Sequence, residues 1–151
     1  MSRGVTSDRY APYDRLRFDW PDDRSGGVLR ITLDDPDKMN ATDAAMHLQL
    51  SRVFREVGDD DDVRAVIVTG SGRGFCAGAD LTAVGDPSRR NHLDPDGGMP
   101  GPMGPSRMAL SKPLIAAVSG YAVAGGLELA LLADLRVMER DAVFGVFCRR
   151  W

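Results

Sequence analysis

The sequence has little of what marks several large classes of protein. It contains two cysteines, Cys76 and Cys148, which are too few for a disulfide framework and favour a reducing compartment, the cytoplasm. Its formal net charge of −3 argues against a general affinity for nucleic acid or an anionic membrane, which requires a basic surface, although a local basic patch could still bind a phosphate-rich cofactor. Residues 1–13 lack the apolar stretch of a secretory signal, and no apolar run is long enough to span a bilayer. We therefore expect neither a nucleic-acid nor a membrane partner.

The remaining composition is typical of a soluble globular protein. Hydrophobic residues make up 43% and charged residues 27% of the 151 positions, and this length allows one domain with a real core. Residues 1–13 are predicted to be a loose tail. Apolar and polar residues alternate over 15–20 and 28–33, which predicts two strands joined by a turn. A polar loop over residues 34–40 follows.

A helix is expected to begin near Thr42 or Asp43, both suitable N-caps, and to end at Gly58. Its apolar residues recur every three or four positions and so form one stripe facing a core. They are Met46, Leu50, Val53, Phe54 and Val57. The four acids of residues 59–62 are predicted to form a solvated turn rather than a cation site, because metal-binding loops space their carboxylates.

The second half of the chain alternates buried strands with loops and a helix. Strands are expected over 65–69, 114–118 and 135–138, a helix over 125–133 and a mobile loop over 85–105, which is rich in glycine and proline. Cys76 is expected to be buried, and His47 and His92 are expected on the surface. The order of these elements predicts an α/β fold with repeated ββα units.

Two segments could carry chemistry, and the first covers residues 70–81. Glycines after a buried strand let backbone N–H groups approach a ligand closely. The segment is not a dinucleotide loop, because no set of glycines has the G-x-G-x-x-G spacing and the P-loop ending is absent. A simple turn would explain the glycines of residues 70–74 equally well.

The second segment covers residues 112–130, where a buried strand leads through small residues into a helix. The start of a helix presents free N–H groups and a positive dipole end, which together favour an anion. Glu128 follows Gly125 by about one turn and lies among apolar residues. We expect such a carboxyl to have a raised pKa and to exchange protons near neutrality, unless it pairs with an arginine.

Together the two segments resemble the crotonase (enoyl-CoA hydratase/isomerase) family. Residues 75–81, FCAGADL, resemble the family segment F-x-A-G-A-D-L, and residues 112–130 resemble K-P-x-I-A-A-V-x-G-x-A-x-G-G-G-x-E-L-A. The resemblance runs from about Leu16 to the last residue and covers the N-terminal part of the family fold. It implies a spiral of ββα units in which residues 14–151 form an incomplete domain, truncated before the C-terminal helical part.

The resemblance also implies a mechanism. The N–H groups of Ala79 and Gly125 would hold the thioester carbonyl of an acyl-CoA substrate and stabilise its enolate, each such donor contributing about 10²–10³ in rate. Glu128 matches the first catalytic glutamate, which activates the water. The adjoining positions would bind substrate: Ala77, Gly78, Asp80, Leu81 and Gly126. Neither a metal nor a separate cofactor is implied, because coenzyme A is part of the substrate.

Two positions depart from the family pattern. Cys148 stands where hydratases have a second glutamate, and a thiol is a poor general acid. Ala124 replaces the first glycine of the usual triple, which we interpret as a mild change. The resemblance as a whole implies reversible hydration of 2-enoyl-CoA in fatty acid metabolism. Because of Cys148, a one-glutamate enoyl-CoA isomerase is an alternative, and a catalytically inactive fragment is another. It implies a homotrimer or hexamer for the full-length protein, and an uncovered apolar face over residues 114–147 in this chain.

Overall fold

The computed structural model describes residues 10, 13–98 and 100–147. Its larger sheet contains the strands β1 (Leu16–Asp19), β2 (Val28–Leu33), β3 (Ala65–Gly70), β5 (Leu114–Val118) and β7 (Leu135–Met138) in the order β1-β2-β3-β5-β7. β1 runs antiparallel to β2, and every other pair is parallel. The predicted strands of this sheet lie where they were expected, β2 and β5 with the same bounds.

A second, smaller sheet contains β4 (Gly74–Cys76), β6 (Tyr121–Val123) and β8 (Val143–Gly145), all parallel. The chain alternates between the two sheets, since β3, β5 and β7 enter the larger sheet and β4, β6 and β8 follow each of them into the smaller one. This alternation confirms the predicted fold of repeated ββα units. It also places the ends of β4 and β6 next to each other.

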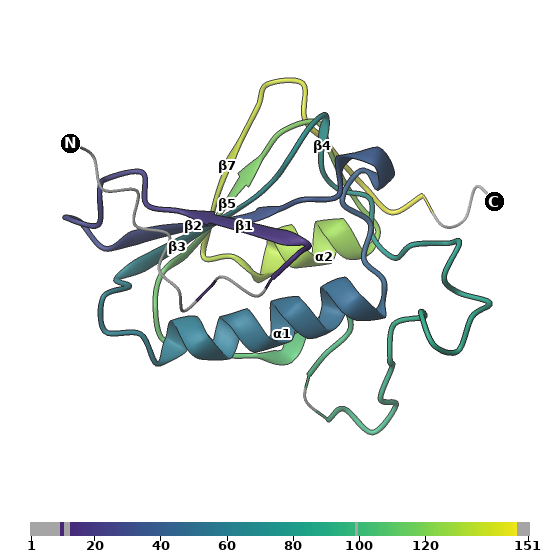
Figure 1. The fold of residues 1–151 in the computed structure, drawn as a ribbon. Coiled ribbons are helices and arrows are strands. Elements are labelled where there is room, and N and C mark those ends of the chain that lie inside the picture. The colour runs from purple at the N-terminus through teal and green to yellow at the C-terminus, as the bar shows by residue number, and fades with distance from the viewer. Residues whose placement is uncertain (1–9, 11–12, 99, 148–151) are drawn as a thin grey trace.

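The two α-helices lie on the same side of the larger sheet (Figure 1). Helix α1 (Ala44–Gly58) begins after Asp43, whose carboxylate accepts a hydrogen bond of 3.1 Å from Met46 N. Helix α2 (Gly125–Leu132) connects β6 to β7. Short 3₁₀ helices occupy residues Pro36–Lys38 (η2) and Pro105–Arg107 (η3). No helix within the described residues has the length and apolar character needed to cross a membrane.

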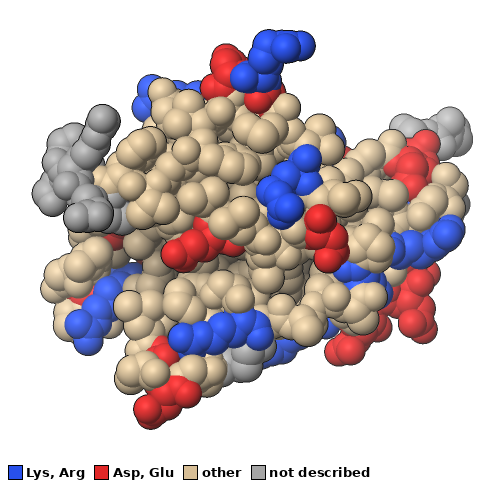
Figure 2. All heavy atoms as spheres, turned by 180° about the vertical axis from the view of Figure 1, so that it is seen from behind, with Lys and Arg blue, Asp and Glu red and all other residues tan. Residues whose placement is uncertain are grey.

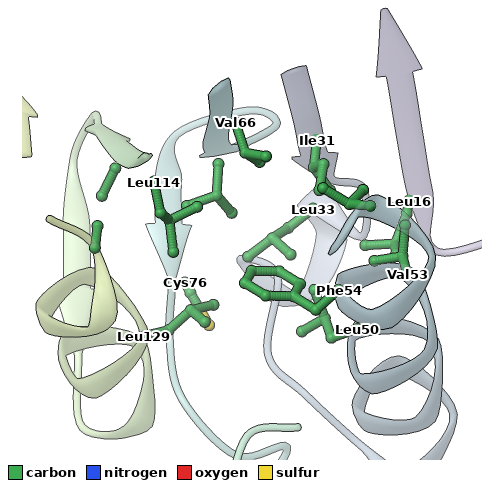
Figure 3. Close-up of a cluster of buried hydrophobic side chains, with 14 of the residues drawn as sticks. Leu16, Ile31, Leu33, Leu50, Val53, Phe54, Val66, Cys76, Leu114 and Leu129 are labelled. Carbon is green, nitrogen blue, oxygen red and sulfur yellow. The ribbon is translucent and has the colours of Figure 1, made fainter. Parts of the chain in front are cut away.

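The core lies between the larger sheet and the two helices. The predicted stripe of α1 is buried, and its side chains point toward those of the sheet strands (Figure 3). Leu129 of α2 and Cys76 of β4 complete the core on the other side, near Leu114. The two helices and the two sheets therefore share one hydrophobic core.

Asn40 is a buried polar residue that the periodicity of the sequence did not reveal. Its amide Nδ2 donates to the carbonyl oxygens of Ser71 and Gly74, each at 2.9 Å, and its Oδ1 accepts from Asp35 N at 2.9 Å. Buried backbone groups without partners are costly, so one amide that satisfies several of them holds the loops around it in place. Asn40 thus joins the loop before α1 to the turn between β3 and β4.

The structure corrects three expectations about polar residues. The acids of residues 59–62 are not all solvated, because Asp60 is buried and accepts a hydrogen bond of 2.6 Å from the Tyr10 hydroxyl. His47 is buried on α1, whereas His92 is exposed as expected. Most of the predicted loose tail, residues 1–13, lies outside the described residues, but Tyr10 and Tyr13 are both buried.

The burial of His47 predicts a dependence of stability on pH. Burial, with a smaller effect of the charge on His92, lowers the pKa of His47 below its usual 6.5, and Nδ1 has no hydrogen-bond partner among the described residues. The unfolded chain then binds a proton more readily than the folded one, so stability is full above about pH 7 and falls as the pH drops below the unfolded pKa. Urea unfolding between about pH 7 and pH 5 measures this slope.

We expect the variant His47→Gln to lose that slope, whereas His92→Gln, at an exposed position, keeps most of it. An equal slope in the wild type and in His47→Gln would contradict the assignment.

Part of the predicted uncovered apolar face is present. β5 is largely buried, but Leu135 and Val137 of β7 are 62% and 66% exposed and Leu131 of α2 is 57% exposed. Figure 2 shows broad uncharged areas on the face opposite to that of Figure 1. Exposed apolar side chains on an edge strand favour association, so we expect this surface to promote self-association or binding of a partner.

Candidate active site

The two candidate segments lie side by side although residues 82–111 separate them in the chain. β4 and β6 are parallel neighbours, with Gly74 opposite Tyr121 and Cys76 opposite Ala122. The residues that follow each strand therefore meet at the same edge of the small sheet, as the carboxyl ends of parallel strands do. Residues 77–81 and 124–128 form a continuous surface there.

The backbone of Ala79 is held by Thr42, on the loop before α1. Thr42 N donates to Gly78 O at 2.7 Å, and Asp80 N donates to Thr42 O at 2.8 Å. These bonds use the groups on either side of Ala79, so its own N–H is directed away from Thr42. That N–H donates to no acceptor among the described residues, and Ala79 is exposed. A ligand oxygen can therefore reach it.

The second free N–H belongs to Gly125, the first residue of α2. In the described part of the chain it has no acceptor, as is normal for the first turn of a helix. A Cβ atom placed on Gly78 would lie 3.0 Å from Gly125 N, so the two segments approach to van der Waals distance. Gly78 has φ +88°, which also favours glycine. The predicted pair of donors is therefore brought together.

Ala124 is in a backbone conformation that the sequence did not reveal. It has φ 49° and ψ −122° and precedes the first turn of α2. An L-residue with this positive φ is strained, whereas glycine adopts it freely. The interpretation of Ala124 as a mild departure from the family pattern was therefore wrong, because alanine strains the backbone at this position and the family glycine would not.

We expect Ala124→Gly to raise the free energy of unfolding by about 1 kcal/mol, the relief of strain less the extra entropy of glycine in the unfolded chain. Ala133→Gly, at the other end of α2 with an ordinary φ of −68°, is the matched control and should lower it. Denaturant unfolding of both variants measures the difference. A loss of stability in Ala124→Gly would contradict the assignment of strain.

Glu128 projects from the first turn of α2 into solvent. The side chain is exposed, so the apolar surroundings predicted for it are not found. A pocket of about 440 Å³ opens beside it, lined by Pro102, Ser106, Arg107, Glu128, Leu131 and Leu132. No salt bridge joins Glu128 to an arginine within the described residues. Its carboxylate is therefore free to contact a ligand in this pocket.

Asp80 holds the loop that follows Ala79. Its carboxylate contacts Lys38 Nζ at 2.6 Å, Arg89 at 3.3 Å and the Thr82 hydroxyl at 2.7 Å. The hydrogen bonds from Lys38 and Thr82 lower the pKa of Asp80 to about 2. Its side chain is thus engaged within the protein, whereas the neighbouring Leu81 is 81% exposed. Among the other residues predicted to bind substrate, Ala77 is half-buried and Gly78 and Gly126 are buried.

The two cysteines differ in what the structure shows of them. Cys76 is buried as predicted, its thiol donates to Asn40 O at 3.1 Å, and burial raises its pKa to about 11. It is therefore a structural residue rather than a nucleophile. Cys148, which occupies the position of the family's second glutamate, lies outside the described residues.

Comparison with known proteins shows which family has this arrangement of segments. Residues 23–148 match the family model described as enoyl-CoA hydratase/isomerase. A probable peroxisomal enoyl-CoA hydratase of Arabidopsis thaliana is 39% identical over 120 residues, covering 80% of this chain and 44% of the relative. A 1,2-epoxyphenylacetyl-CoA isomerase of Escherichia coli is 38% identical over 128 residues, covering 78% of this chain and 46% of that relative. The crystal structure of an enoyl-CoA hydratase from Mycobacterium marinum matches with a TM-score of 0.76 and 36% identity, covering 90% of this chain and 50% of that one.

The two-sheet spiral and its match to that crystal structure define a crotonase-type fold. The chain belongs to the enoyl-CoA hydratase/isomerase family. It spans about half the length of the curated relatives it matches, as expected for the N-terminal part of the family fold.

Proposed function

We propose that this chain contributes the thioester-binding part of an enoyl-CoA hydratase-type active site. One observation supports the proposal above the others: two free backbone N–H groups, on Ala79 and Gly125, lie on adjoining segments with Glu128 one turn beyond the second. Preorganised backbone donors stabilise the oxygen of an enolate as its charge develops. Small residues suffice at both positions because the donors belong to the backbone.

In this proposal, the thioester carbonyl oxygen of a 2-enoyl-CoA accepts hydrogen bonds from Ala79 N and Gly125 N. Polarisation of the carbonyl makes carbon 3 electrophilic. The Glu128 carboxylate accepts a proton from a water molecule as its oxygen bonds to carbon 3, and a proton then returns to carbon 2 to give 3-hydroxyacyl-CoA. Proton transfer by a positioned carboxylate contributes about 10²–10⁴ in rate.

The isomerase alternative uses the same donors. Glu128 would then remove a proton from carbon 2 of a 3-enoyl-CoA and return it to carbon 4, which needs one carboxylate rather than two. The presence of cysteine at position 148 favours this alternative, since a thiol of ordinary pKa is a poor general acid.

The experiment is to mix the purified chain with crotonyl-CoA and with 3-hexenoyl-CoA and to identify products by mass and by proton NMR. Hydration adds one water, whereas isomerisation leaves the mass unchanged and moves the double bond. Saturable acyl-CoA binding without turnover would support the catalytically inactive alternative, and no binding of any acyl-CoA would contradict the proposal.

Compartment and assembly remain predictions. A cytoplasmic location was expected from the low cysteine content, although the Arabidopsis relative is named as peroxisomal. The homotrimer or hexamer was expected of the full-length protein, and the exposed side chains of β7 are compatible with a larger assembly. Analytical ultracentrifugation of the chain measures its association directly.

A further inference from the structure

Met103 is brought to the candidate site by an unusual turn in the long loop after Asp80. Gly104 N donates to Gly101 O at 3.0 Å, and both Met103 and Gly104 have positive φ angles, 62° and 94°. Positive φ is unfavourable for methionine and is retained only where surrounding contacts impose it. The turn directs the Met103 side chain inward, where the residue is 4% exposed.

The thioether of Met103 lies between the two segments that carry the donors. The Thr42 hydroxyl donates to Met103 Sδ at 3.1 Å, and the backbone of Thr42 is the one that holds Ala79. On the other side, a Cβ atom placed on Gly125 would lie 2.9 Å from Met103 Cγ and 3.1 Å from Cε. Met103 therefore contacts both halves of the site without supplying a donor to it.

The loop around Met103 also forms the wall of the pocket at Glu128. Pro102, directly before Met103, and Ser106, shortly after it, both line that pocket. A substrate held by Ala79 N and Gly125 N with its reacting carbons at Glu128 would thus place the start of its acyl chain against this loop. The apolar, flexible side chain that faces Gly125 is that of Met103.

We infer that Met103 is a specificity-determining residue, whose thioether closes the floor of the acyl site beside Gly125 and limits the size of the acyl group that fits. The inference rests on the proposed function, because it takes the two N–H groups as the thioester site. Methionine fills such a space with a polarisable, unbranched chain, and truncation of this side chain would leave room for additional methylene groups.

The test compares dissociation constants of butyryl-CoA, octanoyl-CoA and free coenzyme A for the wild type, Met103→Ala, Met103→Leu and Met103→Phe. One or two methylene groups in an apolar pocket change affinity by about tenfold or more. We therefore expect Met103→Ala to shift the octanoyl-to-butyryl affinity ratio about tenfold toward octanoyl-CoA. Met103→Phe should shift it toward butyryl-CoA, Met103→Leu should leave it nearly unchanged, and free coenzyme A should bind all four equally.

The outcomes separate the inference from the proposal beneath it. An affinity ratio that is the same in all variants, while acyl-CoA binds more tightly than coenzyme A, overturns the role of Met103 and leaves the proposed function intact. Equal binding of acyl-CoA and coenzyme A by the wild type overturns both. Circular dichroism verifies folding, and if Met103→Ala unfolds, the comparison of the larger Met103→Phe with Met103→Leu decides the question.

Discussion

Glu128→Gln is expected to lower the turnover of crotonyl-CoA by about 10²–10⁴-fold while leaving its binding nearly unchanged. Glutamine preserves the size and hydrogen-bonding capacity of the side chain but cannot accept the proton of water. Because Glu128 is exposed, the substitution has little effect on folding, and the loss should appear in kcat rather than in KM. Steady-state hydration kinetics measure the change, with 3-enoyl-CoA as the substrate if the chain is an isomerase.

The matched control is Glu139→Gln, which makes the same change at an exposed glutamate just after β7. Turnover in this variant should equal that of the wild type. Unchanged turnover in Glu128→Gln would contradict the assignment of Glu128 as the proton-transfer residue, and an equal loss in both variants would point to a general effect of surface charge.

Gly126→Ala is expected to lower turnover by about 10²-fold and to destabilise the fold by about 3 kcal/mol. A Cβ atom at this position would lie 2.7 Å from the carbonyl carbon of Cys76 and closer still to its oxygen. These are backbone atoms of β4 that cannot move aside, so the start of α2 must shift away from the small sheet. The shift displaces Gly125 N from Ala79 N and so separates the two donors.

Gly58→Ala is the control for this substitution. Gly58 is also helical, at the end of α1, but an added Cβ atom would meet nothing closer than 4.0 Å. Alanine there should stabilise the chain by a few tenths to about 1 kcal/mol, because it restricts the unfolded state and fits the folded one. Urea unfolding measures the change in the free energy of unfolding for each variant. A decrease for Gly126→Ala with an increase for Gly58→Ala would support the close approach of α2 to β4, whereas an increase for both would contradict it.

The sequence alone predicted the strands of the larger sheet and both α-helices, but none of the three short strands of the smaller sheet. Alternation over residues 28–33 and the short apolar run over 114–118 predicted strands with the bounds that are observed, and the stripe from Met46 to Val57 predicted the buried face of α1. These are local patterns, and a side chain's position in a strand or a helix follows directly from its spacing in the chain. The two glycine-containing motifs likewise predicted the family, whereas the roles of Ala79, Gly125 and Glu128 remain predictions.

What only the tertiary structure decided were the relations between residues far apart in the chain. Parallel pairing of β4 with β6 places Gly78 against Gly125, and no local pattern reports that pairing. The burial of His47 and Asp60, the hydrogen bonds of Asn40 and the position of Met103 likewise depend on what packs against them. Glu128 shows the opposite case, since its apolar neighbours in the chain did not bury it.

The crotonase resemblance therefore came from two short motifs whose residues are close together in the sequence. The geometry that makes them a candidate site came from the packing of strands and loops, because hydrogen bonds, burial and backbone strain arise only when distant segments meet.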